Sequence, residues 1–380
     1  MPPPSPTPAQ PSELTTRISK VAGAVFVAFI ATGFVSCGWL LLSGKVEMLP
    51  PNLTRQVVLE GDVTHKLAKQ LSKATLPEQA ADLERGASWL LLHDTGPRVR
   101  SGCPGWLFLT DEFKLNRHAQ ANADTKANAL IDIQQRLAKR GIQLLVAVVP
   151  DKSRIVTDQL CALRRPAALD GRVQGWTDAL QKAGVAAIDL TSTLQPLGAA
   201  AYLRTDTHWS ESGAGAAAKA IAQRVQALGV TASPQKSFDV HTEDATRRPG
   251  DLVRLAGIDW LPLTWQPTPE IVATTQIRER AVAPQGSDDN LDDLFGDDNL
   301  PNVALIGTSF SRNSSFAGFL QQALGAPIGN FAKDGGEFSG AANAYFINPA
   351  FKKTPPKLIV WEIPERDLQT PYTDLIVWGK

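Results

Sequence analysis

Apolar and polar positions divide most of this chain into short buried strands separated by amphipathic helices. Continuously apolar runs bounded by glycine, proline or charged residues predict strands covered on both faces, and apolar stripes at three- and four-residue spacing predict helices. Strands are predicted at 142–149, 185–189, 303–306, 327–331 and 357–363, and helices at 125–139, 167–182, 211–228, 312–324 and 340–347. Buried strands separated by helices predict an α/β fold with a doubly wound, mostly parallel sheet of the flavodoxin-like type.

The first hundred residues follow a different pattern. Residues 1–19 are rich in proline and predict a disordered tail, because such a segment can bury little apolar surface. Residues 20–44 include 24 consecutive positions without a charge, enough to cross a hydrocarbon core of about 30 Å as a transmembrane helix. Residues 45–99 carry a helical pattern and are predicted to form a stalk or leading helices before a catalytic domain at 100–380.

Charged residues around the apolar segment predict its orientation in the membrane. Arg17 and Lys20 precede it, which predicts a cytoplasmic N-terminus, a single-pass anchor in the inner membrane and a periplasmic catalytic domain. Lys45 follows the segment and weakens this asymmetry. Cys37 suits a cleaved lipoprotein signal, but the apolar run continues beyond it, which favours an uncleaved anchor.

Composition bears on the class of partner. The chain has 38 basic and 38 acidic residues, so its overall charge gives no argument for binding nucleic acid.

Residues 233–300 interrupt the alternation of strands and helices and contain an acidic run from Asp288 to Asp298. Because this run lacks the glycine and terminal glutamate of a calcium loop, it is predicted to be a solvated loop, and no metal site is expected.

Two cysteines, Cys103 and Cys161, follow the predicted membrane segment. An even number of cysteines in an oxidising compartment predicts a disulfide between them. The alternative is two separate buried thiols.

Candidate chemistry begins at Ser309, at the predicted junction between a strand and a helix. Unpaired backbone amides at a helix N-terminus favour negative charge, so a serine there can act as a nucleophile with a stabilised oxyanion. Serine is also a common helix cap, and the short string Gly307-Thr308-Ser309, taken alone, fits that use better.

The string Asp206-Thr207-His208 supplies the two groups that a nucleophilic serine needs, a base and a carboxylate that orients it. Ser210 is predicted to cap the following helix, so the chain before it is expected to be extended. Side chains two residues apart then project to the same side. The alternative for His208 is a structural histidine.

These strings resemble the paired signatures of the AlgX/AlgJ-like alginate O-acetyltransferases, a permuted branch of the SGNH hydrolase superfamily. As in that branch, the Asp/His string precedes the serine, the reverse of the usual SGNH order. The resemblance covers about residues 100–370 and implies an SGNH-like fold. Its motifs, in chain order, are Gly105-Trp-Leu-Phe-Leu109, Val149-Pro-Asp-Lys-Ser153, Asp206-Thr-His208-Trp209, Gly250-Asp-Leu252, Gly307-Thr-Ser309-Phe-Ser311 and Trp361-Glu-Ile-Pro-Glu-Arg366.

The resemblance implies that Ser309 is the nucleophile, His208 its base and Asp206 the group that orients His208. For the oxyanion hole, the Ser309 amide is the first candidate. Gly336, in a glycine turn after a predicted strand, is the second. The alternative for Gly336 is an ordinary tight turn.

Three further residues, Arg312, Asn313 and Tyr345, are candidates for binding sugar or acetyl groups. They lie in or just after the two segments that carry Ser309 and Gly336. Their alternative use is on the surface or in helix packing.

The predicted function is a membrane-anchored O-acetyltransferase that acetylates hydroxyls of an exported polysaccharide, alginate-like or another exopolysaccharide, through an acetyl-serine and without a cofactor. The resemblance implies a multi-spanning membrane O-acyltransferase as the acetyl donor, and other exopolysaccharide export proteins as partners. One alternative is a carbohydrate acetylesterase with the same triad. Another is a non-catalytic polysaccharide-binding scaffold.

Overall fold

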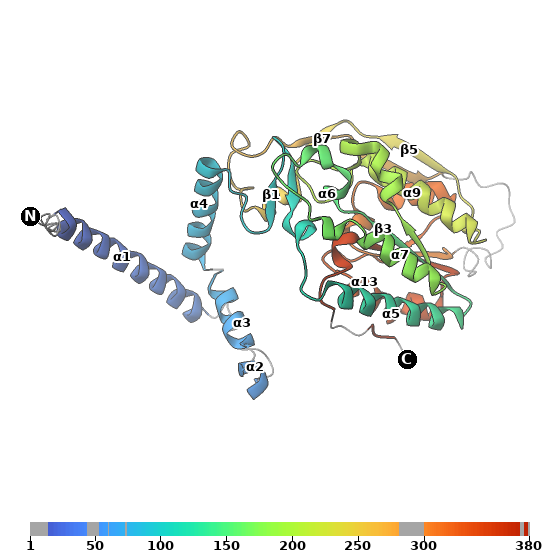
Figure 1. Cartoon of the computed structure of the whole chain (residues 1–380), viewed down its shortest axis with the longest axis horizontal. Coiled ribbons are helices and arrows are strands. Elements are labelled where there is room, and N and C mark those ends of the chain that lie inside the picture. The colour runs from blue at the N-terminus through green and yellow to red at the C-terminus, as the bar shows by residue number, and fades with distance from the viewer. Residues whose placement is uncertain are drawn as a thin grey trace, which may run out of the picture. The chain divides into compact units, whose positions relative to one another are not determined.

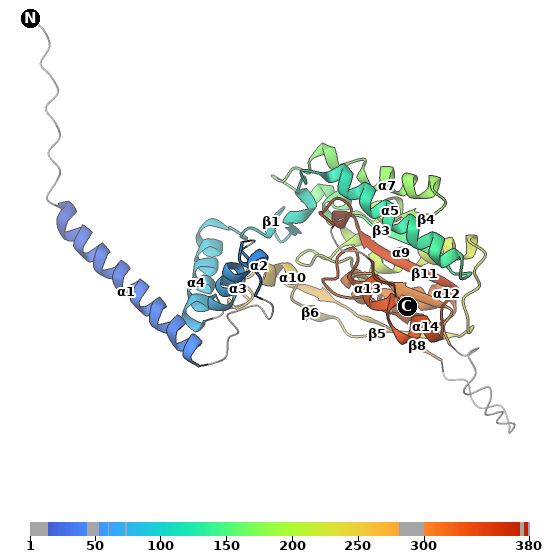
Figure 2. The same cartoon turned by 90° about the horizontal axis from the view of Figure 1, so that it is seen from below.

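The computed structural model describes residues 14–43, 53–59, 61–72, 74–280, 300–372 and 376–378. The chain divides into two compact units, Met1–Leu92 and His93–Lys380, shown in Figures 1 and 2. Most of the predicted N-terminal tail and the whole acidic run lie outside the described residues.

The first unit is helical and begins with the apolar segment. Helix α1 (Leu14–Leu42) contains a segment of 24 residues, Ser19–Leu42, that is long and apolar enough to cross a membrane. Nearly all its described large apolar side chains are exposed. Three shorter helices follow: α2 (Arg55–Leu59), α3 (Asp62–Leu71) and α4 (Thr75–Leu92).

The second unit is built around a five-stranded sheet in which every neighbouring pair is parallel. The carboxyl ends of all five strands therefore lie at one edge, where loops in such folds collect ligands. The spatial order is β10 (Gly329–Asn330), β9 (Val303–Ile306), β11 (Leu358–Pro364), β3 (Gln143–Val149) and β4 (Ala186–Asp189).

Helices cover both faces of this sheet, which confirms the predicted doubly wound α/β fold (Figures 1 and 2). Successive strand residues alternate between two hydrophobic cores: in β3, Leu145 and Ala147 face one core, and Val146 and Val148 face the other. The first core includes residues of α6 (Lys152–Ile155), α8 (Thr191–Leu194), α9 (Glu211–Ala227) and α12 (Phe316–Leu324); the second includes residues of α5 (Ala119–Ala138), α7 (Arg172–Lys182), α13 (Gly340–Phe346) and α14 (Pro349–Lys353).

The helix predicted to begin at residue 312 begins later. The chain forms a 3₁₀ turn, η6 (Ser309–Arg312), and α12 starts only at Phe316. Ser314 and Ser315 between them have φ values of 51° and 56°, in the left-handed region that interrupts a right-handed helix. Ser309 therefore lies in a separate turn and not at the N-terminus of the long helix. The helix predicted at 167–182 is also divided, into η3 (Ala167–Leu169) and α7.

The predicted interruption at 233–300 contains regular structure. Its described part holds two antiparallel ladders and a short helix, α10 (Asp251–Leu255), which begins next to the Asp206 loop. The ladders pair β5 (Phe238–Thr242) with β8 (Thr275–Glu279), and β6 (Thr246–Arg248) with β7 (Glu270–Val272).

A disulfide joins Cys103 to Cys161, which are 58 positions apart in the chain. Cys103 follows the first strand of a small hairpin, β1 (Val99–Ser101) and β2 (Leu107–Leu109), which leads into the 3₁₀ turn η1 (Thr110–Phe113). Cys161 follows η2 (Thr157–Gln159). Cys37, in α1, has a free thiol.

Candidate active site

Ser309 lies in a turn held by a buried carboxylate from the neighbouring strand. Thr308 donates its N–H (2.7 Å) and its hydroxyl (3.0 Å) to Glu362 in β11, and the Ser311 hydroxyl also donates to Glu362 (3.0 Å). Gly307 permits this approach, because a Cβ at this position would lie 2.5 Å from Glu362 Oε2. The turn is therefore fixed on the sheet edge, while Ser309 itself is only half-buried.

Asp206 and His208 lie in a tight loop between Tyr202 and Trp209. Tyr202 and Trp209 form an isolated antiparallel bridge that closes the loop. The Leu203 N–H donates to the His208 carbonyl (3.1 Å). The loop consists of bends, so the prediction of an extended segment is wrong.

The side chains of Asp206 and His208 nevertheless meet. Asp206 Oδ1 lies 2.6 Å from His208 Nδ1 and also accepts the His208 backbone N–H (3.0 Å), which folds the carboxylate back over its own chain. The predicted cap at Ser210 is confirmed: its hydroxyl accepts the Gly213 N–H at the start of α9 (3.1 Å).

Core packing brings this loop to the Ser309 turn. The Trp209 ring packs on Phe310 and on Phe316, with centroid separations of 5.1 Å and 4.6 Å. The Ser314 hydroxyl donates to the Trp209 carbonyl (2.7 Å). Residues about a hundred positions apart in the chain are thus joined by buried aromatic contacts.

The outcome is a continuous chain of hydrogen-bonding groups from Asp206 through His208 to Ser309. His208 Nε2 lies 2.7 Å from Ser309 Oγ, while Nδ1 on the other side of the ring lies 2.6 Å from Asp206 Oδ1. Burial alone would raise the pKa of Asp206, but hydrogen bonds from His208 and the charge of that ring lower it to about 2. A charged Asp206 keeps a proton on Nδ1 and leaves Nε2 free to accept one from Ser309.

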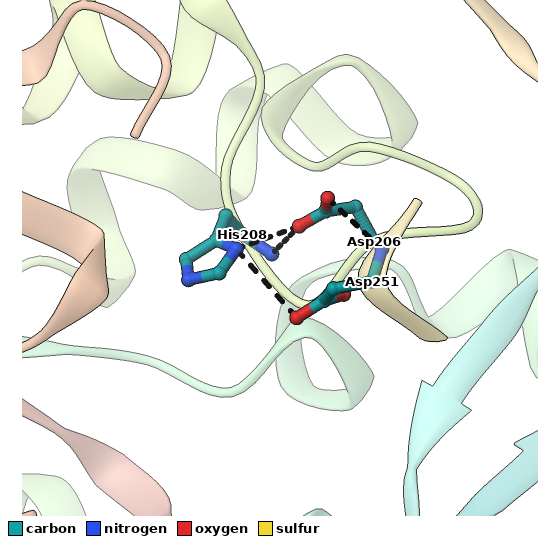
Figure 3. A group of neighbouring side chains, drawn as sticks. All are labelled: Asp206, His208 and Asp251. Carbon is teal, nitrogen blue, oxygen red and sulfur yellow. Dashed lines mark hydrogen bonds and ion pairs between the residues drawn. The ribbon is translucent and has the colours of Figure 1, made fainter. Parts of the chain in front are cut away.

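A second carboxylate, Asp251, braces the same loop at the start of α10 (Figure 3). It accepts the Thr207 N–H (2.7 Å) and the Thr207 hydroxyl (2.6 Å), and its own N–H donates to Asp206 Oδ2 (3.3 Å). Gly250 makes this possible, since a Cβ there would lie 1.9 Å from the Thr205 carbonyl oxygen.

The group formed by Asp206, His208 and Asp251 also has the composition of a metal site, because one potential ligand atom from each lies within 4.8 Å of the others. Its atoms are already used in hydrogen bonds, however. Asp206 Oδ1 faces two N–H groups of His208, and both Asp251 oxygens accept from Thr207. The arrangement thus fits a hydrogen-bonded triad and its brace better than it fits a metal.

Below the loop, Lys152 holds the backbone in place. Its buried ammonium donates to the carbonyls of Leu107 (2.6 Å), Arg204 (2.7 Å) and Asp206 (3.1 Å). Burial lowers the pKa of Lys152 to about 8, and the charge of Glu112 is the largest of the influences that oppose this shift. Three donors and three acceptors match, so Lys152 serves the loop and not a ligand.

Of the residues predicted to bind sugar or acetyl groups, Asn313 contacts the Ser309 turn and Arg312 is exposed. Asn313 Nδ2 donates to the Ser309 carbonyl (2.9 Å), and its Oδ1 accepts from Arg248 (3.0 Å). Arg312 is largely exposed and lies 3.8 Å from Asp334. Asn313 thus braces the Ser309 turn, and Arg312 lies on the surface beside it.

Gly336 and Tyr345 do not present free groups to Ser309. The Gly336 N–H donates within its own turn to the Lys333 carbonyl (3.1 Å), and the residue lines a separate cavity of about 580 Å³. Tyr345 is 2% exposed and packs on Phe331 in the core. By contrast, the Ser309 amide makes no hydrogen bond to the described part of the chain.

Sequence reasoning missed the charged residues that support the site. Asp251, Glu362, Lys152 and Arg248 are not among the predicted site residues, although the first three lie in strings that carry the family resemblance. Arg248 lies 3.8 Å from Asp206 Oδ2. The available signal was the presence of charged residues inside apolar motifs, since charged side chains are rarely buried without a partner.

The chain is similar to one family model and to several known proteins over most of its length. The model of the family described as SGNH hydrolase-like domain, acetyltransferase AlgX, matches residues 99–365. The probable alginate O-acetylase AlgJ of Pseudomonas aeruginosa is 32% identical over 318 residues, covering 82% of this chain and 81% of that protein. Its counterpart in Azotobacter vinelandii is 33% identical over 290 residues, with coverage of 75% and 73%. The solved O-acetyltransferase domain of Pseudomonas putida AlgJ has a TM-score of 0.63 at 29% identity, covering 73% of this chain and 94% of that one.

Proposed function

The chain belongs to the AlgX family of SGNH hydrolase-like acetyltransferase domains, and on this premise we propose that it transfers acetyl groups to hydroxyls of an exported polysaccharide, alginate or a similar polymer. The observation that carries the proposal is the 2.7 Å contact between His208 Nε2 and Ser309 Oγ, with Asp206 on the opposite side of the ring. This is the geometry that activates a serine for acyl transfer.

In the first half of the proposed reaction, Ser309 Oγ attacks the carbonyl carbon of the acetyl donor, and His208 Nε2 takes the hydroxyl proton. Asp206 stabilises the imidazolium that forms. The Ser309 N–H, which has no acceptor among the described residues, is the proposed donor to the oxyanion. Collapse of the tetrahedral intermediate breaks the bond to the donor's leaving group, which takes the proton from His208 and leaves acetyl-Ser309.

In the second half, a sugar hydroxyl gives its proton to His208 Nε2 and attacks the acetyl-serine. The ester bond to Ser309 breaks, and His208 returns the proton to Ser309 Oγ. The products are an O-acetylated sugar and the original enzyme. Every proton transfer uses the same nitrogen, so no cofactor is required by this scheme.

The proposal includes a place and partners. The apolar segment of α1 supports a single-pass anchor in the inner membrane with its N-terminus in the cytoplasm and the catalytic unit in the periplasm. Cytoplasmic acetyl-CoA does not reach such a site. A multi-spanning membrane O-acyltransferase is therefore the proposed acetyl donor, working with other polysaccharide export proteins.

The test is acetyl transfer by the purified full-length chain in detergent, given 4-nitrophenyl acetate with and without an oligosaccharide acceptor. We expect acetylated sugar by mass spectrometry and, without acceptor, an acetyl group on the peptide containing Ser309. Replacing Ser309 with Ala removes the attacking oxygen and should lower the rate by roughly 10⁴-fold or more.

Two results would contradict this proposal. Release of acetate with no acetylated sugar at any acceptor concentration indicates an esterase. Unchanged polymer acetylation in cells that carry Ser309→Ala indicates a scaffold whose acetylation activity resides elsewhere.

A further inference from the structure

Arg366 lies at the same edge of the sheet as Ser309. It belongs to the 3₁₀ turn η7 (Glu365–Asp367), directly after β11. Strand β11 pairs in parallel with β9, and the last paired residues are Trp361 and Ile306. Both strands continue in the same direction, so η7 and the Ser309 turn follow adjacent strand ends.

Arg366 differs from the other arginines at this edge. Arg154, Arg165 and Arg172 all donate to the buried carboxylate of Glu365. Within the described residues, the Arg366 guanidinium makes no hydrogen bond or ion pair, and its side chain is half-buried. A guanidinium has five N–H donors, and leaving them all unused near an active site is costly unless a ligand or water accepts them.

A ring contact fixes where this guanidinium points. Its central carbon lies 5.3 Å from the centroid of the Phe310 ring. Phe310 directly follows Ser309, and its ring centroid lies 5.0 Å from that of His208. One phenyl ring therefore contacts both the catalytic base and the free guanidinium.

The surrounding charges keep Arg366 positive. Burial works against its charge, but Asp367 and the more distant carboxylates of Asp151, Glu112 and Glu362 raise the pKa of Arg366. None of these carboxylates is within ion-pair distance of the guanidinium in the described structure. The guanidinium therefore stays charged, with no acceptor among the described residues.

We propose that Arg366 binds the carboxylate of an acidic sugar unit in the acceptor polysaccharide, next to the unit whose hydroxyl is acetylated. The inference rests on the proposed function and assigns the residue that recognises the charge of the acceptor. A guanidinium matches a carboxylate with two parallel N–H···O bonds, which fixes orientation as well as position. An acceptor held in this way presents a neighbouring hydroxyl to His208 and the acetyl-serine.

The experiment compares two acceptors with the full-length chain: a mannuronate oligosaccharide and the same oligosaccharide after reduction of its carboxyl groups to alcohols. We expect the wild-type protein to have a kcat/KM for acetyl transfer about 10- to 100-fold higher with the acidic acceptor, the value of one charged hydrogen-bonded contact. Arg366→Gln should bring the ratio of the two kcat/KM values close to one, mainly through KM. Arg366→Lys should keep part of it.

The matched control is Arg136→Gln, on the exposed face of α5, where the side chain pairs with Asp132. It should keep the wild-type ratio. Calorimetric binding of the acidic oligosaccharide to the Ser309→Ala protein, with and without Arg366→Gln, measures recognition without turnover and should show the same loss.

A ratio of the two kcat/KM values near one in the wild-type protein, or an unchanged ratio in Arg366→Gln, would overturn the inference. An equal loss of kcat/KM with both acceptors in Arg366→Gln would also overturn it, because it would indicate a role at the reacting acetyl group. If the wild-type protein transfers acetyl to neither acceptor while the Ser309→Ala protein still binds the acidic one through Arg366, the proposed transferase function fails and carboxylate recognition stands.

Discussion

At the scale of single residues, the proposed reaction depends on the charge of Asp206. Its Oδ1 faces both the ring Nδ1 and the backbone N–H of His208. In Asp206→Asn, the amide can donate to Nδ1 and place the ring proton on Nε2, where it blocks proton transfer from Ser309. We expect kcat for acetyl transfer from 4-nitrophenyl acetate to an oligosaccharide to fall by about 10⁴-fold.

The same substitution tests the low pKa of Asp206. The folded-state pKa of about 2 lies below the ordinary value of 3.8, so the charged form stabilises the fold above the ordinary pKa, and this contribution is lost as pH falls towards 2. Urea unfolding should show wild type more stable than Asp206→Asn by about 2 kcal/mol at pH 7. The difference should shrink between about pH 4 and pH 2. A constant difference across that range would contradict the assignment.

Single residues also show what a sequence can and cannot predict. The meeting of Asp206, His208 and Ser309 was predictable from two short strings taken together, although the Ser309 string alone favours a helix cap. Glu362 and Lys152 have only the general signal of a charge inside an apolar string, and this signal does not identify the donors or acceptors from distant parts of the chain against which each is buried. Their partners are fixed by tertiary structure.

At the scale of elements, the position of α10 depends on one close backbone contact. Gly250 has φ −78° and ψ 153°, which alanine adopts easily, so any effect of Gly250→Ala comes from contact alone. The added Cβ would lie 1.9 Å from the Thr205 carbonyl oxygen. Relief of this clash would move Asp251 away from Thr207. We expect a loss of roughly 1–3 kcal/mol in the free energy of unfolding and a lower kcat, measured by urea unfolding and acetyl transfer.

The matched control is Gly175→Ala in α7, where a Cβ meets nothing within 4 Å. Because alanine is the better helix former, this change should stabilise the protein by about 0.5–1 kcal/mol and leave kcat unchanged. Equal changes in the free energy of unfolding and in kcat for the two variants would show that the α10 contact does not position the site.

Among elements, the buried strands were predicted well and their order was not. The run at 357–363 predicts β11 within one residue at each end, because a strand covered on both faces is continuously apolar. Its position between β9 and β3 depends on long-range pairing and has no local signal. The ladders of β5–β8 and β6–β7 were missed because most of their residues face solvent and show no buried run.

At the scale of the whole molecule, the proposed location and the covalent structure depend on each other. The Cys103–Cys161 disulfide closes a loop of 58 positions that includes β3, α5 and the buried Lys152. Such a bond persists in an oxidising compartment, which is where the proposed orientation of α1 places the catalytic unit. A catalytic unit held in the cytoplasm should instead contain two free thiols.

We therefore predict that the exported full-length protein contains this disulfide and that a version retained in the cytoplasm does not, as measured by alkylation and peptide mass mapping without reduction. In the exported protein, the double substitution Cys103→Ser and Cys161→Ser should lower the free energy of unfolding by about 2–4 kcal/mol, because the unfolded chain regains the freedom of a long loop. Ser replacement of Cys37, which has a free thiol in α1, serves as the control and should leave the stability of the catalytic unit unchanged. Two alkylatable thiols at 103 and 161 in the exported protein would contradict the proposed compartment, because nothing in an oxidising environment would keep neighbouring cysteines reduced.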